Sequence, residues 1–273
     1  MKNVYIITGG SSGIGLECGK EFKDGIVLIT GRNEDRLINA AEELKAEGID
    51  VVYKTSDISD KNSVSELFDY AKTLGSIKAV INSAGVSGVG VDAASTFEID
   101  LIGAQNLIDL TKKHMEKGTV LVLVASMMGH VVPSNEKYDY FLENPTEEGS
   151  IDALLQITQN KSDLAYNFSK KGVHMLVKKY AAEFGSKGAR ILSLSPGIIM
   201  TPMGEAAAEA HPEQMGYMKS MTPAGRNGKP EDIGSVIAFL VGENASFITG
   251  TDLIVDGGLT VNMPKIMAAS ANS

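Results

Sequence analysis

The sequence predicts a doubly wound α/β fold, in which a parallel sheet of about seven strands is covered by helices on both faces. Seven short runs rich in β-branched residues recur along the 273 residues, and stretches with helical periodicity lie between them. The runs are continuously apolar rather than alternating, which indicates strands that are buried on both faces. Hydrophobic residues make up 43% of the chain and charged residues 22%, as in an ordinary globular protein.

The strands are expected where the apolar runs lie, and the helices in the intervals between them. The expected strands are 4–8, 26–30, 51–53, 79–81, 120–124, 190–194 and 253–255. The expected helices are 15–22, 35–47, 63–74, 96–117, 164–184 and 230–240. Pro230 suits the first turn of the last helix because proline has no backbone N–H to leave unpaired, and Glu231 and Asp232 complement the helix dipole.

The chain is expected to form one Rossmann-like domain over residues 1–260, because no linker rich in Pro, Gly or Ser divides it. Residues 127–165 break the alternation of strands and helices. They are polar and acidic, and they are expected to form an inserted loop with one short helix. Residues 261–273 are rich in small side chains and are expected to be a flexible tail or an interface arm.

Composition excludes several classes of partner. The formal net charge of −9 argues against nucleic acid, whose phosphates attract an excess of Lys and Arg. The apolar run 120–125 is far shorter than the ~20 residues that a membrane span needs, and no signal peptide is expected. The single cysteine, Cys18, excludes an intrachain disulfide, so a cytoplasmic protein is expected.

The four histidines show no metal-ligand spacing, so no metal site is expected. They are His114, His130, His174 and His211. His130 follows Ser126 by four residues, and it is interpreted either as a solvated loop residue or as a substrate contact.

A glycine-rich turn at residues 8–15, with the sequence TGGSSGIG, joins the first expected strand to the first expected helix. Glycines let the backbone approach a ligand closely, and the free N–H groups at a helix N-terminus favour negative charge. Such a turn can also be only a tight connection, but its place after the first buried strand favours a diphosphate site.

The end of the second strand indicates which dinucleotide is bound. Sites for NAD usually place a carboxylate about 20 residues after the glycines, whereas an arginine there accommodates the 2′-phosphate of NADP. Here Gly31 is followed by Arg32, and Glu34 is the first acidic residue. NADP(H) is therefore the preferred cofactor and NAD(H) a possible one. The alternative is that Arg32 is a surface cation in a loop.

Further polar residues fall on the carboxyl edge of the sheet, where ligands bind in open α/β folds. Asp57 and Asn82 end the third and fourth strands, and Ser126 follows the fifth. Tyr166 and Lys170 lie four residues apart, on one face of a later helix. A tyrosine and a lysine at this spacing are common and carry little information alone. Here they occur together with the glycine turn, Asn82 and Ser126, so they are not an isolated motif.

Over nearly its whole length the chain resembles a short-chain dehydrogenase/reductase of the classical type. The matching residues are Thr8, Gly9, Gly13, Gly15, Asp57, Asn82, Ala84, Gly85, Ser126, Tyr166, Lys170, Ser195, Pro196, Gly197 and Thr201. The resemblance implies an oligomeric enzyme, a homodimer or homotetramer, that interconverts a carbonyl and an alcohol with a nicotinamide cofactor. It implies cofactor contacts at Thr8, Gly9, Ser11, Ser12, Gly13, Ile14, Gly15, Gly31, Arg32, Asp57, Ile58, Asn82, Ala84, Gly85, Tyr166, Lys170, Pro196, Gly197, Ile199 and Thr201.

The resemblance also implies a mechanism. Tyr166 donates the proton, Ser126 orients the substrate oxygen, and Lys170 lowers the pKa of the phenol and holds the ribose. Lowering a phenol pKa of about 10 by ~3 units takes about 4 kcal/mol of differential stabilisation, which positive charges can supply.

Three positions depart from the family pattern. Ser83 replaces an asparagine, and Asp100 stands where the family has its fourth catalytic residue, an asparagine. Asp100 can keep that role through its backbone carbonyl, or its carboxylate can raise the pKa of Lys170. The gap from Ser126 to Tyr166 is unusually wide and is similar to that of bacterial 3α-hydroxysteroid dehydrogenase/carbonyl reductase.

Many methionines lie just after Ser126 or after Pro196-Gly197. They suggest a plastic apolar pocket for a steroid-like or aromatic substrate, because thioether side chains adapt to bulky ligands. The pocket residues are expected to be Met127, Met128, Met200 and Met203. The alternative is that most of these methionines pack inside the protein. A catalytically silent dinucleotide sensor is the other functional hypothesis, which the presence of Ser126, Tyr166 and Lys170 disfavours.

Overall fold

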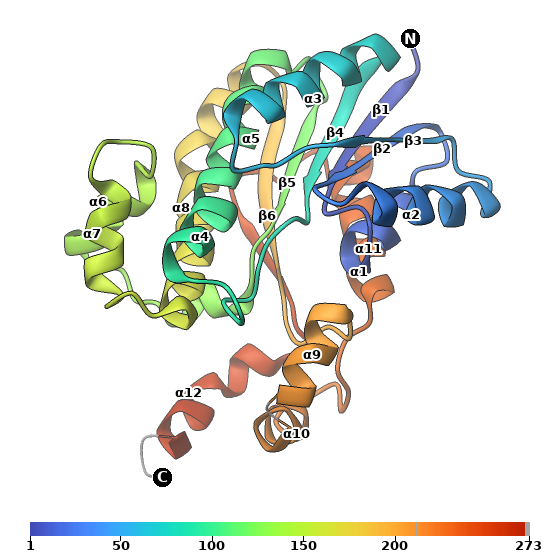
Figure 1. Ribbon diagram of the computed structural model, residues 1–273. Coiled ribbons are helices and arrows are strands. Elements are labelled where there is room, and N and C mark those ends of the chain that lie inside the picture. The colour runs from blue at the N-terminus through green and yellow to red at the C-terminus, as the bar shows by residue number, and fades with distance from the viewer. Residues whose placement is uncertain (211, 271–273) are drawn as a thin grey trace.

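The computed structural model describes residues 1–210 and 212–270, and it contains one parallel sheet of seven strands in the order β3-β2-β1-β4-β5-β6-β7 (Figure 1). The strands are β1 (Asn3–Thr8), β2 (Gly25–Gly31), β3 (Val51–Thr55), β4 (Ser76–Asn82), β5 (Val120–Val124), β6 (Arg190–Pro196) and β7 (Asp252–Val255). The strand order reverses between β1 and β4, which is where doubly wound sheets bind ligands. The predicted fold class is confirmed.

Helices cover both faces of the sheet. One face carries α3 (Lys61–Leu74), α4 (Ala93–Phe97), α5 (Gly103–His114) and α8 (Ser162–Ser186), whose buried side chains form one core with β1, β4 and β5. The other face carries α1 (Gly13–Glu21), α2 (Glu34–Ala46) and α11 (Pro230–Val241), which form the second core. The two layers separate clearly in Figure 1.

The expected helix 96–117 is not continuous. A π-helical turn, η1 (Glu98–Ile102), lies between α4 and α5. A π turn inserts an extra residue into the helical repeat, and such turns occur frequently at functional sites. Here the turn carries the buried Asp100. The periodicity of apolar residues alone does not predict this break.

Strand β7 departs from the expectation that all strands are buried on both faces. It is the edge strand beside β6, and Leu253 and Ile254 are 37% and 38% exposed. An apolar run of three residues therefore does not show by itself whether a strand is central or at the edge.

The segment 127–165 is more ordered than the expected loop. It contains the 3-10 turn η2 (Met127–Val131), α6 (Glu136–Glu143) and α7 (Ser150–Ile157). Tyr138, Leu142 and Leu154 are buried in the core that α8 also joins, and Figure 1 shows α6 and α7 on the outer side of α8. Asn135 caps α6, since its side chain accepts a hydrogen bond from the Lys137 N–H at 3.0 Å.

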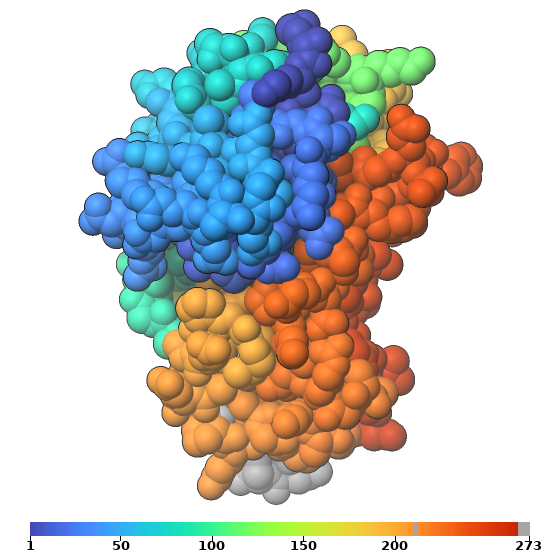
Figure 2. Space-filling view, turned by 90° about the vertical axis from the view of Figure 1, so that its right-hand side faces the viewer, coloured from blue at the N-terminus to red at the C-terminus, as the bar shows by residue number. Residues whose placement is uncertain are grey.

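The last part of the chain forms a separate lobe below the carboxyl end of the sheet. It consists of α9 (Pro202–Ala210), α10 (Pro212–Ser220) and α12 (Leu259–Ser270) (Figures 1 and 2). The expected tail is thus a helix as far as residue 270, and Met263 and Ile266 are buried beside Met127. Residues 271–273 lie outside the described part. Within the described residues, no helix has the length and apolar character to cross a membrane.

Candidate active site

A cleft of about 550 Å³ lies between the carboxyl ends of the strands and the α9–α10 lobe. In Figure 2 this lobe, drawn in orange, lies below the blue β–α units of the N-terminal half. Residues from the β1–α1 turn, the ends of β2, β4 and β5, helix α8 and the segment after β6 line the cleft. The structure thereby brings together parts of the chain that are far apart in the sequence, from Thr8 to Met218.

The glycine-rich turn forms one end of the cleft. Gly9 has a φ of +65°, and a Cβ there would lie 2.7 Å from the backbone nitrogen of Ala84. Helix α1 begins at Gly13, Ser12 provides no side-chain cap, and the first turn has no acidic residue. Its N–H groups are therefore available to an anion, and the turn fits the diphosphate of a dinucleotide.

Two predicted cofactor contacts do not line the cleft. Gly15 packs against the turn itself, and a Cβ there would lie 2.3 Å from the carbonyl oxygen of Gly9. Asn82 is 4% exposed, and its Oδ1 accepts a hydrogen bond of 2.6 Å from the hydroxyl of Thr8. That bond joins β4 to β1. Gly15 and Asn82 thus position the residues that face the cleft.

The other predicted cofactor contacts all line the cleft. They are Thr8, Gly9, Ser11, Ser12, Gly13, Ile14, Gly31, Arg32, Asp57, Ile58, Ala84, Gly85, Tyr166, Lys170, Pro196, Gly197, Ile199 and Thr201. Asp57 is held in place by Ser59, whose N–H and hydroxyl donate to Oδ1 at 3.0 and 2.7 Å.

Two arginines stand at the end of β2. Arg32 lines the cleft, and so does Arg36, which the sequence analysis did not single out. Asn33 caps α2 by accepting a hydrogen bond of 2.9 Å from the Arg36 N–H. The spacing of Arg32 and Arg36, four residues apart around a helix N-terminus, is the signal that identifies the pair. Among the described residues that line the cleft, Asp57 is the one carboxylate, so this end of the cleft favours an anion.

Ser126, Tyr166 and Lys170 lie on the same cleft wall. Ser126 follows β5, and its Oγ accepts a hydrogen bond of 3.1 Å from the Met128 N–H, which starts η2. Tyr166 and Lys170 are one turn apart on α8, with the Lys170 Nζ 5.3 Å from the centre of the Tyr166 ring. Lys170 is 6% exposed. The predicted triplet is thus assembled around one space.

Asp100 stands behind Lys170 rather than in the cleft wall. Its Oδ2 lies 3.4 Å from the Lys170 Nζ, and its Oδ1 accepts a hydrogen bond of 2.9 Å from the Val86 N–H. Burial raises the pKa of Asp100, against the opposing effect of Lys170. Burial alone would lower the pKa of Lys170, but Asp100 and Tyr166 reverse this and raise it. The ammonium form of Lys170 is therefore favoured at neutral pH.

The close approach of Asp100 and Lys170 to the backbone after β4 requires glycine at position 85. A Cβ on Gly85 would lie 2.9 Å from the Asp100 Oδ1 and 3.3 Å from the Lys170 Nζ. The absence of a side chain at Gly85 thus leaves room for the buried ion pair.

The apolar end of the cleft contains three of the four expected pocket methionines, Met127, Met128 and Met203. Met215 and Met218 join them, although the notably long segment 129–165 contributes no lining residue. The fourth expected residue, Met200, lies outside the lining, and its sulfur accepts a hydrogen bond of 3.3 Å from the Asn227 side chain. The cleft therefore has a polar glycine-rich end and an apolar methionine-rich end.

Comparison with known proteins agrees with this arrangement. A family model described as short chain dehydrogenase matches residues 3–140, and one described as Enoyl-(Acyl carrier protein) reductase matches residues 149–260. The chain belongs to the short-chain dehydrogenase family. Its members are oxidoreductases.

Two characterised members of the short-chain dehydrogenase family show the range of substrates among relatives. Glucose 1-dehydrogenase of Gluconobacter oxydans is 30% identical over 94% of this chain and 91% of its own. Cyclohexanol dehydrogenase of an Acinetobacter strain is 30% identical over 94% of both chains. A solved short-chain type dehydrogenase/reductase from Mycobacterium ulcerans superposes with a TM-score of 0.77 and 25% identity, covering 95% of this chain and 90% of the other.

Proposed function

We propose that this short-chain dehydrogenase interconverts a carbonyl and a secondary alcohol, with NADP(H) as its preferred cofactor. The observation that carries the proposal is the position of Ser126, Tyr166 and Lys170 on the wall of a cleft whose other end is an anion-binding glycine turn. A bound nicotinamide supplies or accepts the hydride. The residues of the chain must then manage the substrate oxygen and its proton.

In the reducing direction negative charge develops on the substrate oxygen. Tyr166 donates its phenolic proton to that oxygen, and the hydroxyl of Ser126 donates a hydrogen bond that holds the oxygen in place. Lys170 stabilises the phenolate that remains, because opposite charges within a few ångströms favour the ionised form. Asp100 keeps Lys170 in the charged form that this task requires. In the oxidising direction the same groups take the proton back.

Arg32 and Arg36 support the preference for NADP(H). Both line the end of the cleft next to β2, where a dinucleotide sheet fold places the adenosine ribose. A guanidinium group binds phosphate oxygens through two parallel hydrogen bonds, which makes arginine suited to a 2′-phosphate. No carboxylate from 31–36 lines this end among the described residues.

For the substrate, the methionine-rich end favours an apolar carbonyl that is steroid-like or aromatic. Five methionines line the cleft, and unbranched thioethers adapt to bulky apolar groups. Two relatives are named for a sugar and for an apolar alcohol, glucose 1-dehydrogenase and cyclohexanol dehydrogenase. A cyclohexanol-like substrate suits this lining better than glucose, because a sugar needs several polar partners. The wide gap between Ser126 and Tyr166, similar to that of bacterial 3α-hydroxysteroid dehydrogenase/carbonyl reductase, is consistent with this substrate class.

We also propose self-association as a homodimer or homotetramer, in the cytoplasm. Edge strand β7 exposes Leu253 and Ile254, and elsewhere on the surface Phe239 on α11 and Phe247 are 49% and 102% exposed. Such an apolar edge is more stable when covered. The free, buried Cys18 suits a reducing compartment.

The test of the proposal is the kinetics of Tyr166→Phe. Loss of the proton donor should lower kcat by about 10² to 10⁴-fold, the usual contribution of general acid catalysis, while NADPH binding measured by fluorescence persists. Tyr140→Phe is the matched control, because Tyr140 is exposed on α6 and its hydroxyl donates to Glu147, outside the cleft. Unchanged turnover in Tyr166→Phe would refute the mechanism. Tight NADPH binding without turnover of any carbonyl by the unmodified chain would favour a dinucleotide sensor.

A further inference from the structure

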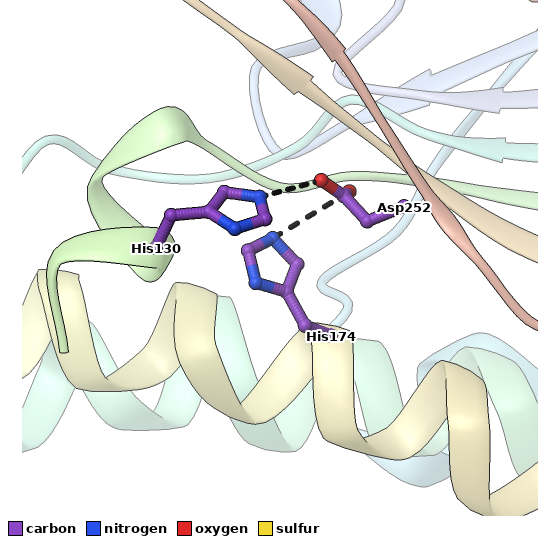
Figure 3. Close-up of side chains that lie close together, drawn as sticks. All are labelled: His130, His174 and Asp252. Atoms are coloured by element: carbon purple, nitrogen blue, oxygen red, sulfur yellow. Dashed lines mark hydrogen bonds and ion pairs between the residues drawn. The ribbon is translucent and has the colours of Figure 1, made fainter. Parts of the chain in front are cut away.

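Two histidines and an aspartate meet on the sheet face beside the active site, although their spacing in the sequence does not predict it (Figure 3). The Nε2 of His130 lies 2.7 Å from the Oδ2 of Asp252, and the Nε2 of His174 lies 3.5 Å from the Oδ1. The centroids of the two imidazole rings are 4.4 Å apart, and the ring planes are tilted by 36° to each other. Both rings therefore direct a nitrogen toward the same carboxylate.

Three separate elements deliver these residues. His130 lies near the C-terminal end of η2, His174 lies one turn after Lys170 on α8, and Asp252 is the first residue of β7. Gly129 permits the close approach of η2 to α8, since a Cβ there would lie 2.6 Å from the Cε1 of His174. The grouping thus depends on tertiary packing.

One oxygen of the Asp252 carboxylate is paired with His130 at 2.7 Å, whereas the other lacks a hydrogen bond to any described residue. The side chain of Asp252 is 7% exposed, and its Oδ1 is buried without a hydrogen-bond partner in the described structure. The side chain of His174 is also 7% exposed, and its Nε2 contacts the hydroxyl of Ser195 at 2.9 Å. A buried acceptor oxygen without a partner is costly, and a bound cation would satisfy it.

We propose that His130, His174 and Asp252 bind a zinc ion. One ligand atom from each residue lies within 4.8 Å of the other two. Zinc binds imidazole nitrogen at about 2.0 Å and carboxylate oxygen at about 2.0–2.2 Å, usually in a tetrahedron, so the ligands close on the ion by side-chain rotation. His130 is 32% exposed at its side chain and provides the access from solvent.

Two imidazoles and one carboxylate form a donor set that suits zinc rather than calcium or magnesium, which prefer oxygen ligands alone. The three protein ligands leave the fourth position of a tetrahedron to water. None of the three residues lines the cleft. The ion therefore has a structural role.

That role follows from the elements it would join. The ligand on η2 is four residues from Ser126, and the ligand on α8 is four residues from Lys170. Zinc would link both elements to β7, and β7 is followed by α12 of the lobe that α9, α10 and α12 form. The ion would thus stabilise the cleft wall that holds Ser126 and Lys170 without contacting the substrate.

The experiment uses the full chain after treatment with a chelator. Isothermal titration with Zn²⁺ should give one saturable site, and Co²⁺ at that site should give the visible absorption of a tetrahedral complex. Zinc should also raise the Tm, because an ion that binds only the native state stabilises it by mass action. His130→Ala should weaken binding by at least about tenfold, and this exposed position should leave the fold intact.

Two further variants keep the test decisive. His114→Ala is the matched control, because the His114 ring contacts Phe68, with ring centroids 5.6 Å apart, and is not part of the cluster. It should bind zinc as the unmodified chain does. Tyr166→Phe should also bind zinc normally, which separates this site from the proposed catalysis. Equal binding by the unmodified chain and His130→Ala, or no saturable binding by the unmodified chain, would overturn the proposal.

Discussion

The two ends of the cleft are built by different means. The glycine-rich end lies at the ends of parallel strands, where a side chain on Gly9 would collide with backbone atoms. The methionine-rich end is made of the turn η2 and helices α9 and α10, whose methionines face the cleft through flexible side chains. The backbone therefore dictates the first end residue by residue, whereas packing alone shapes the second. Substitutions should be costly at the first end and mild at the second.

The largest effect is expected from Gly9→Ala. The new Cβ would meet three atoms of Ser83 and Ala84 at 2.7–2.8 Å, all of them backbone, and the φ of +65° adds about 1–2 kcal/mol of strain. NADPH binding should be lost and the Tm lowered. Gly48→Ala is the matched control, because Gly48 also has a positive φ, +82°, but nothing lies within 4 Å. Equal losses in both variants would show that strain, and not the close approach, sets the requirement at Gly9.

Asp100→Asn should have the next largest effect. It leaves the buried ammonium of Lys170 without its partner, a change that typically costs about 3–5 kcal/mol of stability. The negative charge of Asp100 raises the pKa of Lys170, so its removal should lower that pKa. The alkaline limb of the pH profile of kcat/KM should therefore move to lower pH. An unmoved limb would show that Asp100 does not set the charge of Lys170.

Arg32→Ala should produce a smaller and selective effect. Loss of one guanidinium at the end of β2 should weaken NADPH binding by about tenfold, or about 1.4 kcal/mol, while NADH binding changes little. Arg36→Ala should act in the same direction. Arg226→Ala, which removes an arginine paired with Asp232 outside the cleft, is the control. Equal weakening of both cofactors would contradict the phosphate role.

The smallest effect is expected at the apolar end, from Met203→Ser. Met203 is 45% exposed on α9, so truncation removes one apolar contact among several. The KM for an apolar ketone should rise by about tenfold or less, which is about 1.4 kcal/mol and lies in the lower part of the ~1–3 kcal/mol that a lost apolar contact is worth. Met203→Leu, which conserves volume, should leave the KM nearly unchanged. A large fall in kcat from Met203→Ser would contradict the adaptable character of this end.

The difference between the two ends of the cleft also explains which features the sequence predicts. The glycine turn, Arg32 and the pair Tyr166 and Lys170 are identified by local spacing on elements whose type the apolar runs reveal. The sequence also predicts the seven strands within a few residues. These features depend on backbone geometry, which short patterns encode.

What the sequence does not predict depends on packing between distant segments. The π turn around Asp100 breaks a helix whose apolar pattern continues through it. Helices α6, α7, α9 and α10 are only eight or nine residues long, and α12 follows the last strand, so the alternation of strands and helices does not reveal them. Met200 turns to Asn227 although its neighbour in the same loop, Thr201, lines the cleft. The meeting of His130 and His174 with Asp252 requires three elements to be in place.

The central claim is tested most directly by following cofactor oxidation across a panel of ketones with NADPH and NADH in parallel. The panel contains cyclohexanone, aromatic ketones, quinones, oxosteroids and oxo bile acids, with polar sugar lactones as the comparison class. The account predicts turnover of the apolar ketones, with kcat/KM about tenfold or more higher for NADPH. Turnover restricted to the sugar lactones, or a preference for NADH, would contradict it.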